Sequence, residues 1–214
     1  DTNSISTSGG GNVIAGGGYY NYSTISSSPN RIGANATTNF GFIGGGGDND
    51  LDGSFGVIAG GDTNTLKAQW SFIGGGKNNL VDAGAEYAVV VGGSNNAATA
   101  EESFVGGGIN DTASGDGSVV VGGSSNEASG RHSAILGGTE NNASGENSAV
   151  IGGRGLTISG DNSFGFNAFV SSPTSVSAPK TAFFSNVDLW LANNEDKAKQ
   201  LRFFERSITG TNFT

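Results

Sequence analysis

The side chains that could take part in acid–base chemistry lie in short polar segments that recur along the sequence. His132 is the only histidine, and it follows Arg131 in one of these segments. An enzyme needs an acid, a base or a nucleophile that converge on one point. With no cysteine and evenly spread carboxylates, only hydrolysis by two carboxylates stays open, and nothing in the spacing favours it. The equivalent segments are Glu101-Glu102, Asp116, Glu146-Asn147 and Asp161-Asn162.

The segment Gly44–Asp52, GGGGDNDLD, nearly matches the calcium-binding nonapeptide GGxGxDxUx. Asn49 replaces a ligand aspartate of that pattern, and the match does not recur in later copies. Calcium sites of this kind need stacked repeats to complete a shell of oxygen ligands. We therefore expect an acidic turn without metal, and a calcium site is the alternative.

Three of the four tyrosines lie together in a segment that interrupts the pattern near the N-terminus. This segment is expected to be an insertion in an irregular first coil. Tyrosine offers a flat apolar face and a hydroxyl together, and solenoids often bind ligands through variable segments on one face. The candidate ligand-binding residues are therefore Tyr19, Tyr20 and Tyr22 first, and Arg131 and His132 second.

All these candidates belong to a sequence that repeats about every 15 residues. Each copy has Ser, two or three apolar residues, Gly-Gly, a polar turn, a small apolar residue and Ser-Gly, as in SVVVGGSSNEASGRH and SAILGGTENNASGEN. A fixed short period of this kind predicts a solenoid. We place the copies at Ser54, Ser71, Tyr87, Ser103, Ser118, Ser133, Ser148 and Ser163.

The residues that follow each Ser are expected to form a strand with both faces buried. The second residue is β-branched in the later copies, and side chains alternate along a strand. The first and third residues exchange size, since Phe72 goes with Gly74 whereas Ala134 goes with Leu136. A packed face would keep its summed volume constant, so we expect another chain to cover it. The residues predicted to pack between chains are Phe72, Phe104, Val121, Leu136 and Ile151.

A second short strand is predicted about ten residues after each Ser, where the later copies carry Ala or Ile. Ser-Gly follows, and Gly permits the positive φ of a tight turn. Asn126 and Asn141, 15 residues apart, are expected to form a ladder of hydrogen bonds between coils. Two strands and two turns per copy predict a flattened parallel β-roll.

The composition limits the partners of the protein. The net charge is −9 with only 10 Lys and Arg, whereas nucleic acid and anionic membranes require a basic face. Only 35% of the residues are hydrophobic, which favours a thin repetitive core completed by other chains. Without cysteine there is no disulfide framework, and no apolar run approaches the ~20 residues of a membrane span.

The composition changes after Phe164, since nine of the 19 aromatic residues lie from there onward. We expect Ser171–Pro179 to be a linker, and Val187–Ala192 and Gln200–Phe204 to be strands. The predicted division is an irregular N-terminal part with the Tyr-rich insertion (1–42), a repeat β-roll (43–168), and a linker with a C-terminal cap or neck (169–214).

The repeat, with SAVIGG and ASGENS, resembles the head repeat of trimeric autotransporter adhesins, the YadA-type parallel β-roll. Gly-Gly in place of a single Gly, and the longer unit, depart from that pattern. The segment LRFFERSITGTNFT (Leu201–Thr214) resembles a part of phage-tail-fibre-like and bacterial surface fibre proteins, where it often precedes a chaperone domain that guides trimerisation. Together these resemblances imply a homotrimeric fibre tip and carry over no catalytic residue.

The sequence therefore predicts an all-β parallel β-solenoid assembled as a homotrimer. Its predicted function is a non-enzymatic adhesin or receptor-binding fibre tip, outside the cell on a cell surface or virion, that contacts a surface carbohydrate or protein. No cofactor, metal, nucleic acid or direct membrane insertion is expected. One alternative is a structural spacer that carries another tip, and another is a calcium-stabilised or ice-binding solenoid. Ice binding favours a flat, regular array of Thr, which the variable turns do not provide.

Overall fold

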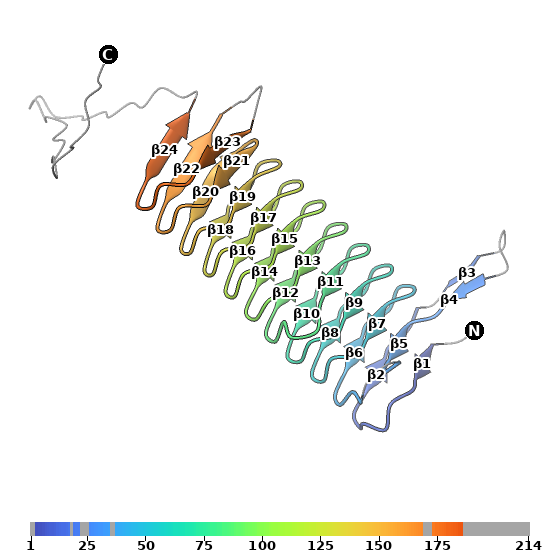
Figure 1. Cartoon of the computed structure of the whole chain (residues 1–214). Helices are drawn as coiled ribbons and strands as arrows, with labels where there is room; N and C mark the ends of the chain where they lie inside the picture. Colours follow the sequence, from blue (N-terminus) through green and yellow to red (C-terminus); the bar gives the residue numbers. More distant parts are fainter. Residues whose placement is uncertain (1–2, 18, 22–25, 35–36, 169–172, 186–214) are drawn as a thin grey trace, which may run out of the picture.

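The chain forms an elongated parallel β-solenoid in the computed structural model (Figure 1). The structure describes residues 3–17, 19–21, 26–34, 37–168 and 173–185. Two sheets of eleven strands each run along the solenoid, and each coil contributes one strand to each sheet. A separate antiparallel hairpin, β3 (Tyr19–Asn21) with β4 (Ser26–Ser28), projects near the N-terminal end. The predicted flattened β-roll is confirmed.

The two sheets are made of very short strands. Sheet A contains β1 (Ser4–Ile5), β5 (Arg31–Ile32), β7 (Asp50–Leu51), β9 (Thr65–Leu66), β11 (Leu80–Val81), β13 (Ala97–Ala98), β15 (Thr112–Ala113), β17 (Glu127–Ala128), β19 (Asn142–Ala143), β21 (Leu156–Ile158) and β23 (Thr174–Val176). Sheet B contains β2 (Val13–Ile14), β6 (Phe42–Ile43), β8 (Val57–Ile58), β10 (Phe72–Ile73), β12 (Val89–Val90), β14 (Phe104–Val105), β16 (Val119–Val120), β18 (Ala134–Ile135), β20 (Ala149–Gly153), β22 (Phe164–Asn167) and β24 (Ala182–Ser185).

Each coil has two turns: turn 1 leads from sheet B to sheet A, and turn 2 leads back to the next strand of sheet B. The register corrects two predicted positions. Ala88, not Tyr87, is equivalent to Ser103, because Val89 pairs with Phe104. Gly56, not Ser54, is likewise equivalent to Ser71. The prediction was wrong because the extra residues of the early copies lie inside turn 2, so Tyr87 and Ser54 belong to that turn.

The solenoid also extends past the predicted repeat boundaries. Strands β1 and β2 extend the two sheets at the N-terminal side, and β23 and β24 extend them at the C-terminal side. The predicted linker therefore contains strand β23, because Val176 is buried and Phe183 packs against the core. The strands predicted at Val187–Ala192 and Gln200–Phe204 lie outside the described residues.

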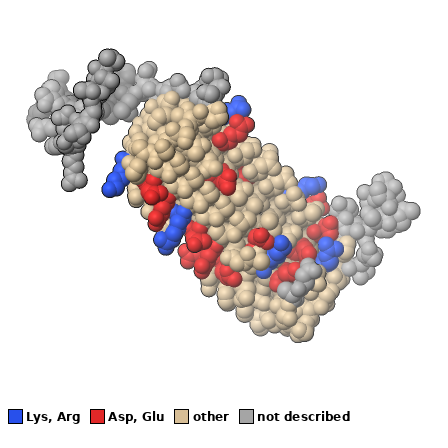
Figure 2. All heavy atoms as spheres, viewed as in Figure 1, with Lys and Arg blue, Asp and Glu red and all other residues tan. Residues whose placement is uncertain are grey.

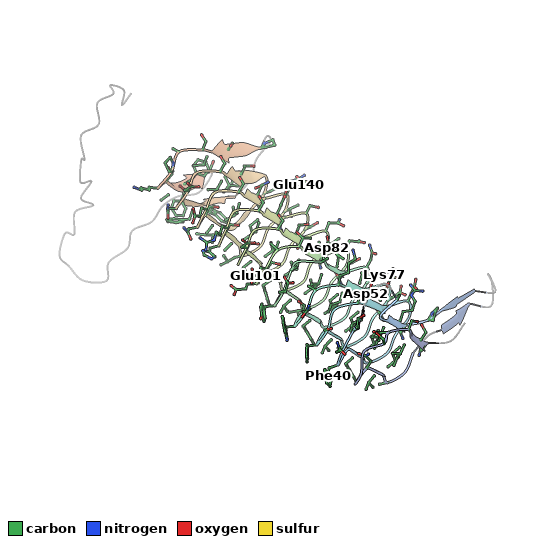
Figure 3. The ribbon with its side chains drawn as sticks, turned by 60° about the horizontal axis from the view of Figure 1, so that its bottom comes forward. Phe40, Asp52, Lys77, Asp82, Glu101 and Glu140 are labelled. Atoms are coloured by element: carbon green, nitrogen blue, oxygen red, sulfur yellow. The ribbon has the colours of Figure 1, made fainter. Side chains whose placement is uncertain are left out.

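The core is a double row of apolar side chains between the sheets. The second residue of nearly every two-residue strand points inward and is fully buried, from Ile43 and Leu51 to Ile135 and Ala143. The first residue points outward, as strand alternation requires. On the face seen in Figure 2, Asp and Glu gather largely toward the margins, and much of the area between carries uncharged side chains. Figure 3 shows Phe40 and Glu101 along one edge of the solenoid.

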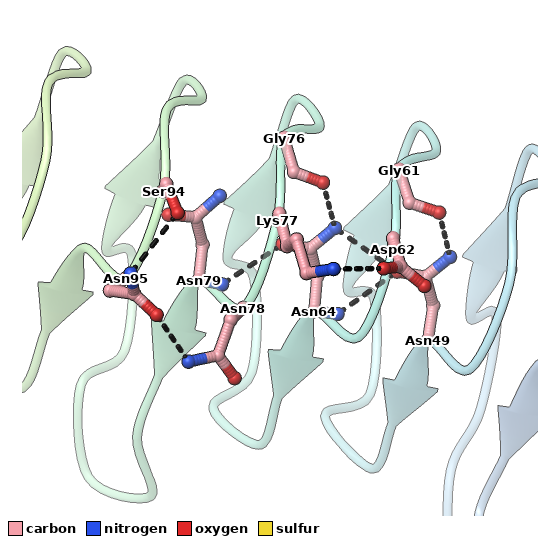
Figure 4. A network of polar contacts seen from close by, with 10 residues as sticks. All are labelled: Asn49, Gly61, Asp62, Asn64, Gly76, Lys77, Asn78, Asn79, Ser94 and Asn95. Carbon is pink, nitrogen blue, oxygen red and sulfur yellow. Dashed lines mark hydrogen bonds and ion pairs between the residues drawn. The ribbon is translucent and has the colours of Figure 1, made fainter.

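A buried ladder of asparagines runs along turn 1. In each step, the backbone N–H of one residue donates to the side-chain oxygen of its counterpart one coil earlier, as from Asn64 to Asn49 at 3.1 Å (Figure 4). The Asn64 amide also donates to the carbonyls of Gly60 and Gly76, both at 3.1 Å. The predicted hydrogen bond between Asn141 and Asn126 is confirmed. The ladder members are Asn30, Asn49, Asn64, Asn79, Asn96, Asp111, Asn126 and Asn141.

Candidate functional site

The clearest functional surface is a row of side chains along turn 2, one from each coil, directly before the position equivalent to Ser103. Every member has a left-handed backbone, with φ between 53° and 63°. We call this set the turn-2 row. Its members are Phe40, Phe55, Trp70, Tyr87, Glu102, Gly117, His132, Asn147, Asn162 and Lys180.

The left-handed backbone has a structural cause. Each N–H of the row points along the solenoid axis and donates to a carbonyl one coil earlier, for example Trp70 N to Ser54 O at 3.0 Å and Asn147 N to Arg131 O at 2.9 Å. Gly and Asn tolerate this conformation best. For other L-residues it costs roughly 1–2 kcal/mol, so bulky rings are an expensive choice here.

Four consecutive members of the row are nevertheless aromatic and form a stack, which we call the aromatic ladder: Phe40, Phe55, Trp70 and Tyr87. Ring centroids are 5.2, 5.9 and 5.3 Å apart, with interplanar angles of 22°, 9° and 8°. The four side chains remain 45–60% exposed. Each stacked pair contributes about 0.5–1.5 kcal/mol, so the three pairs offset only part of the backbone strain.

A polar row accompanies the ladder. The residue before each ring carries an amide, hydroxyl or carboxylate, and these residues are Asn39, Ser54, Gln69 and Glu86. Their backbone carbonyls are held by the row itself, since Phe55 N donates to Asn39 O at 2.8 Å. Within the ladder, each coil therefore presents one exposed ring beside one side chain capable of hydrogen bonding.

The next coils form a charged hollow along the same edge. It has a volume of about 170 Å³ and is lined by Glu101, Glu102, Asp116, Gly117, Arg131 and His132. Gly117 creates the room, because a Cβ there would lie 2.7 Å from Cδ2 of the His132 ring. Arg131 also pairs with Glu146 at 3.6 Å across the neighbouring coil. The structure thus brings together the two predicted ligand-binding residues of this turn.

The hollow offers ion pairing and hydrogen bonding at an open, solvated surface. The described residues contain no group of three or more His, Cys, Asp or Glu side chains arranged to hold a metal ion. The paired Arg131 and Glu146 side chains are more than half exposed, so their attraction is worth little.

The predicted tyrosine site is only partly described. Tyr19 and Tyr20 lie on β3, in the hairpin that projects from the solenoid. Their side chains, and the whole of Tyr22, lie outside what the structure describes. The predicted insertion is confirmed as a hairpin, and ligand contact by these tyrosines stays a prediction.

The residues predicted to pack between chains all lie on the outer face of sheet B. Phe72, Val121, Leu136 and Ile151 are 36–54% exposed, and Phe104 is half-buried. The second face of the strand is therefore not covered within one chain. Its burial by other chains stays a prediction.

The acidic segment near Asp48 does not gather its carboxylates. Asp48 pairs with Arg31 at 3.2 Å, Asn49 belongs to the buried ladder, and Asp50 lies on the outer side of sheet A. Burial raises the pKa of Asp50, and the nearby Asp52 carboxylate adds to the rise. One coil further on, a hydrogen bond from Lys67 lowers the pKa of Asp82.

Sequence reasoning missed the aromatic ladder. Its signal was present, because Phe40, Phe55 and Trp70 recur every 15 residues and Tyr87 follows after 17. The two extra residues lie in turn 2 before Tyr87, since the neighbouring sheet A and sheet B strands are separated by the same shift. Placing Ser54 and Tyr87 at the start of the strand concealed the aromatic period.

No protein-family model matches the chain, and no curated protein is similar to it in sequence. Functional inference therefore depends on the fold and its surfaces. Among the described residues, no helix is long and apolar enough to cross a membrane.

Proposed function

We propose that this protein is a non-enzymatic fibre module that assembles as a homotrimer and binds a surface carbohydrate or protein outside the cell. The observation that carries the proposal is the apolar outer face of sheet B. This face is open to solvent along the solenoid, with exposed side chains that include Val13, Phe42, Phe72, Val91, Val121, Leu136, Ile151, Phe164 and Phe184.

An exposed apolar face of this length calls for a partner. Soluble monomers rarely leave large contiguous apolar patches exposed, and such patches mark interaction surfaces. The outer face of sheet A differs, since its outward residues include Asp50, Thr65, Glu127 and Asn142. One sheet is thus suited to water and the other to association with identical chains.

Trimerisation is the assembly implied by the resemblance to adhesin heads. The parallel coils would let three identical chains align their apolar faces around one axis. The turn-2 row borders sheet B at the edge of the solenoid, and its rings and charged hollow supply the surface for a receptor. The rival function is a spacer whose surface binds nothing.

Assembly is tested first by sedimentation of the full chain, which should give three times the 21.3 kDa chain mass. Leu136→Asp should abolish the trimer, because it places an unpaired carboxylate in the apolar interface. Leu80→Asp makes the same change on the outer face of sheet A and should leave the trimer intact. A stable folded monomer of the parent chain would refute the proposal.

Receptor binding is tested separately with the assembled chain on arrays of surface glycans and extracellular-matrix proteins. Binding to at least one class is expected. A trimer that binds none of them would favour the spacer. Both experiments are independent of which residues make contact.

A further inference from the structure

We infer that the aromatic ladder binds an extended, uncharged saccharide chain that lies along the solenoid axis. The inference rests on the proposed receptor-binding function and assigns it a surface and a ligand class. The site consists of the ladder rings and the polar row beside them. Neither the hairpin tyrosines nor the charged hollow is part of it.

The first argument is that the backbone does not need the rings. Gly117 and Asn147 meet the same left-handed geometry and make the same hydrogen bonds with small side chains. At four successive coils the row instead carries large rings that stay about half exposed. Backbone strain that local stability does not require points to a functional demand.

The second argument is chemical complementarity. A sugar ring has an apolar face of C–H groups and a rim of hydroxyls that donate and accept hydrogen bonds. Aromatic rings match the first, and the side chains of Ser54, Gln69 and Glu86 match the second. Trp70 is the largest ring of the ladder, and it lies between Phe55 and Tyr87.

The third argument is periodicity. The ring and its polar neighbour repeat once per coil, and adjacent parallel strands lie about 4.7–4.9 Å apart. The site is therefore a straight strip with a short, regular repeat. A linear polymer of similar units fits such a strip better than a compact ligand does.

Charge and solvation argue against other occupants. Nucleic acid bases also stack on aromatic rows, but they need a basic groove for the phosphates, and here Glu86 and Glu102 flank the last ring. Anionic glycans meet the same repulsion. A second copy of the chain would have to bury Gln69 and Glu86 together with the rings, which costs energy unless each finds a partner.

The test uses the assembled full chain and soluble neutral polysaccharides, namely a β-glucan, a xylan and a galactomannan, with polygalacturonate as the charged comparison. Binding is measured by affinity electrophoresis and by the fluorescence of Trp70 in a Trp190→Phe background, because these are the two tryptophans. The ladder variant is Phe55→Asn with Trp70→Asn, since Asn occupies the same backbone position at Asn147. Lys180→Asn makes a matched change in the last coil of the row.

We expect at least one neutral polysaccharide to bind and to change the Trp70 emission. The ladder variant should bind at least about tenfold more weakly, as loss of central anchor residues does, with unchanged trimer mass. Lys180→Asn should bind like the parent. Unchanged binding by the ladder variant, or no binding of any neutral polysaccharide by the parent, would overturn the inference.

Two further outcomes separate this inference from the proposed function. If the parent binds a protein receptor and no polysaccharide, the proposed function stands and the saccharide site fails. If iodide quenches Trp70 in the Leu136→Asp chain but not in the parent trimer, a second copy covers the ladder, and the inference also fails.

Discussion

The two halves of the turn-2 row share one backbone and differ in every side chain. From Phe40 to Tyr87 the row is aromatic, and from Glu102 to Asn162 it is polar, yet φ and the hydrogen bonds between coils are the same. The geometry of the turn therefore constrains the backbone but leaves the side chain open. What distinguishes the halves must be what the side chains contact beyond the turn.

The interior changes along the same line. In the aromatic half the inward residue of sheet A is large, as in Leu51 and Leu66, whereas in the polar half it is Ala113 or Ala128. The residue that faces it changes in the opposite sense. Gly41 accompanies Leu51, and a Cβ built on Gly41 would lie 2.9 Å from Leu51 Cδ2. The pattern conserves packed volume rather than residue identity.

The largest expected effect breaks this exchange of volume. Leu51→Ala should lower the free energy of unfolding by about 2–5 kcal/mol, because it leaves a cavity. Gly41→Ala alone should cost about 1–3 kcal/mol through overpacking. Urea unfolding of the double variant should show a loss smaller than the sum.

The matched cycle in the polar half is Ala128→Leu with Ser118→Gly. Here the first change overpacks the coil and the second should relieve it. Strictly additive losses in both cycles would mean that the two positions are not packed against each other.

The ladder of turn 1 provides a second contrast, between Asp111 and its asparagine neighbours. Asp111 accepts from Asn126 through one oxygen, at 2.8 and 3.0 Å, and its other oxygen has no partner. At that place Asn96 donates to two glycine carbonyls. A carboxylate cannot donate, and burial raises the pKa of Asp111.

We therefore predict that Asp111→Asn stabilises the chain at pH 7 by about 1–3 kcal/mol, since it supplies the missing donor. The pKa of Asp111 is higher in the folded chain than in the unfolded one, so the folded chain binds more protons between the two values. Stability then falls as pH rises through that window, and the penalty is complete above the folded pKa. The gain from Asp111→Asn should shrink in acid.

Thermal and urea unfolding between pH 3 and 7, at one protein concentration, measure this effect. Asn126→Asp is the control, because it should create a similar defect at neutral pH that acid relieves. A gain from Asp111→Asn that is the same at both ends of the range would contradict the assignment.

Much of the fold could be predicted because the repeat imposes the same pairing on every coil. The position of the inward residues, as at Ile135, and the hydrogen bond between Asn126 and Asn141 followed from the period alone. The aromatic ladder could not be placed, because two residues inserted before Ala88 move Tyr87 out of step with Ser71. Only strand pairing distinguishes an insertion in the turn from one in the strand.

The smallest expected effect concerns the turn-2 row itself. Tyr87→Asn removes one stacked pair but replaces a strained ring by a residue suited to positive φ, so the free energy of unfolding should change by less than about 1 kcal/mol. Asn147→Phe makes the reverse change in the polar half, where His132 and Asn162 offer no aromatic stack, and should cost about 1–2 kcal/mol of backbone strain. Urea unfolding of both variants at the same protein concentration measures the difference. If Tyr87→Asn cost several kcal/mol, the ladder would be a structural support for its coils, and the case for a functional demand on those rings would lose its first argument.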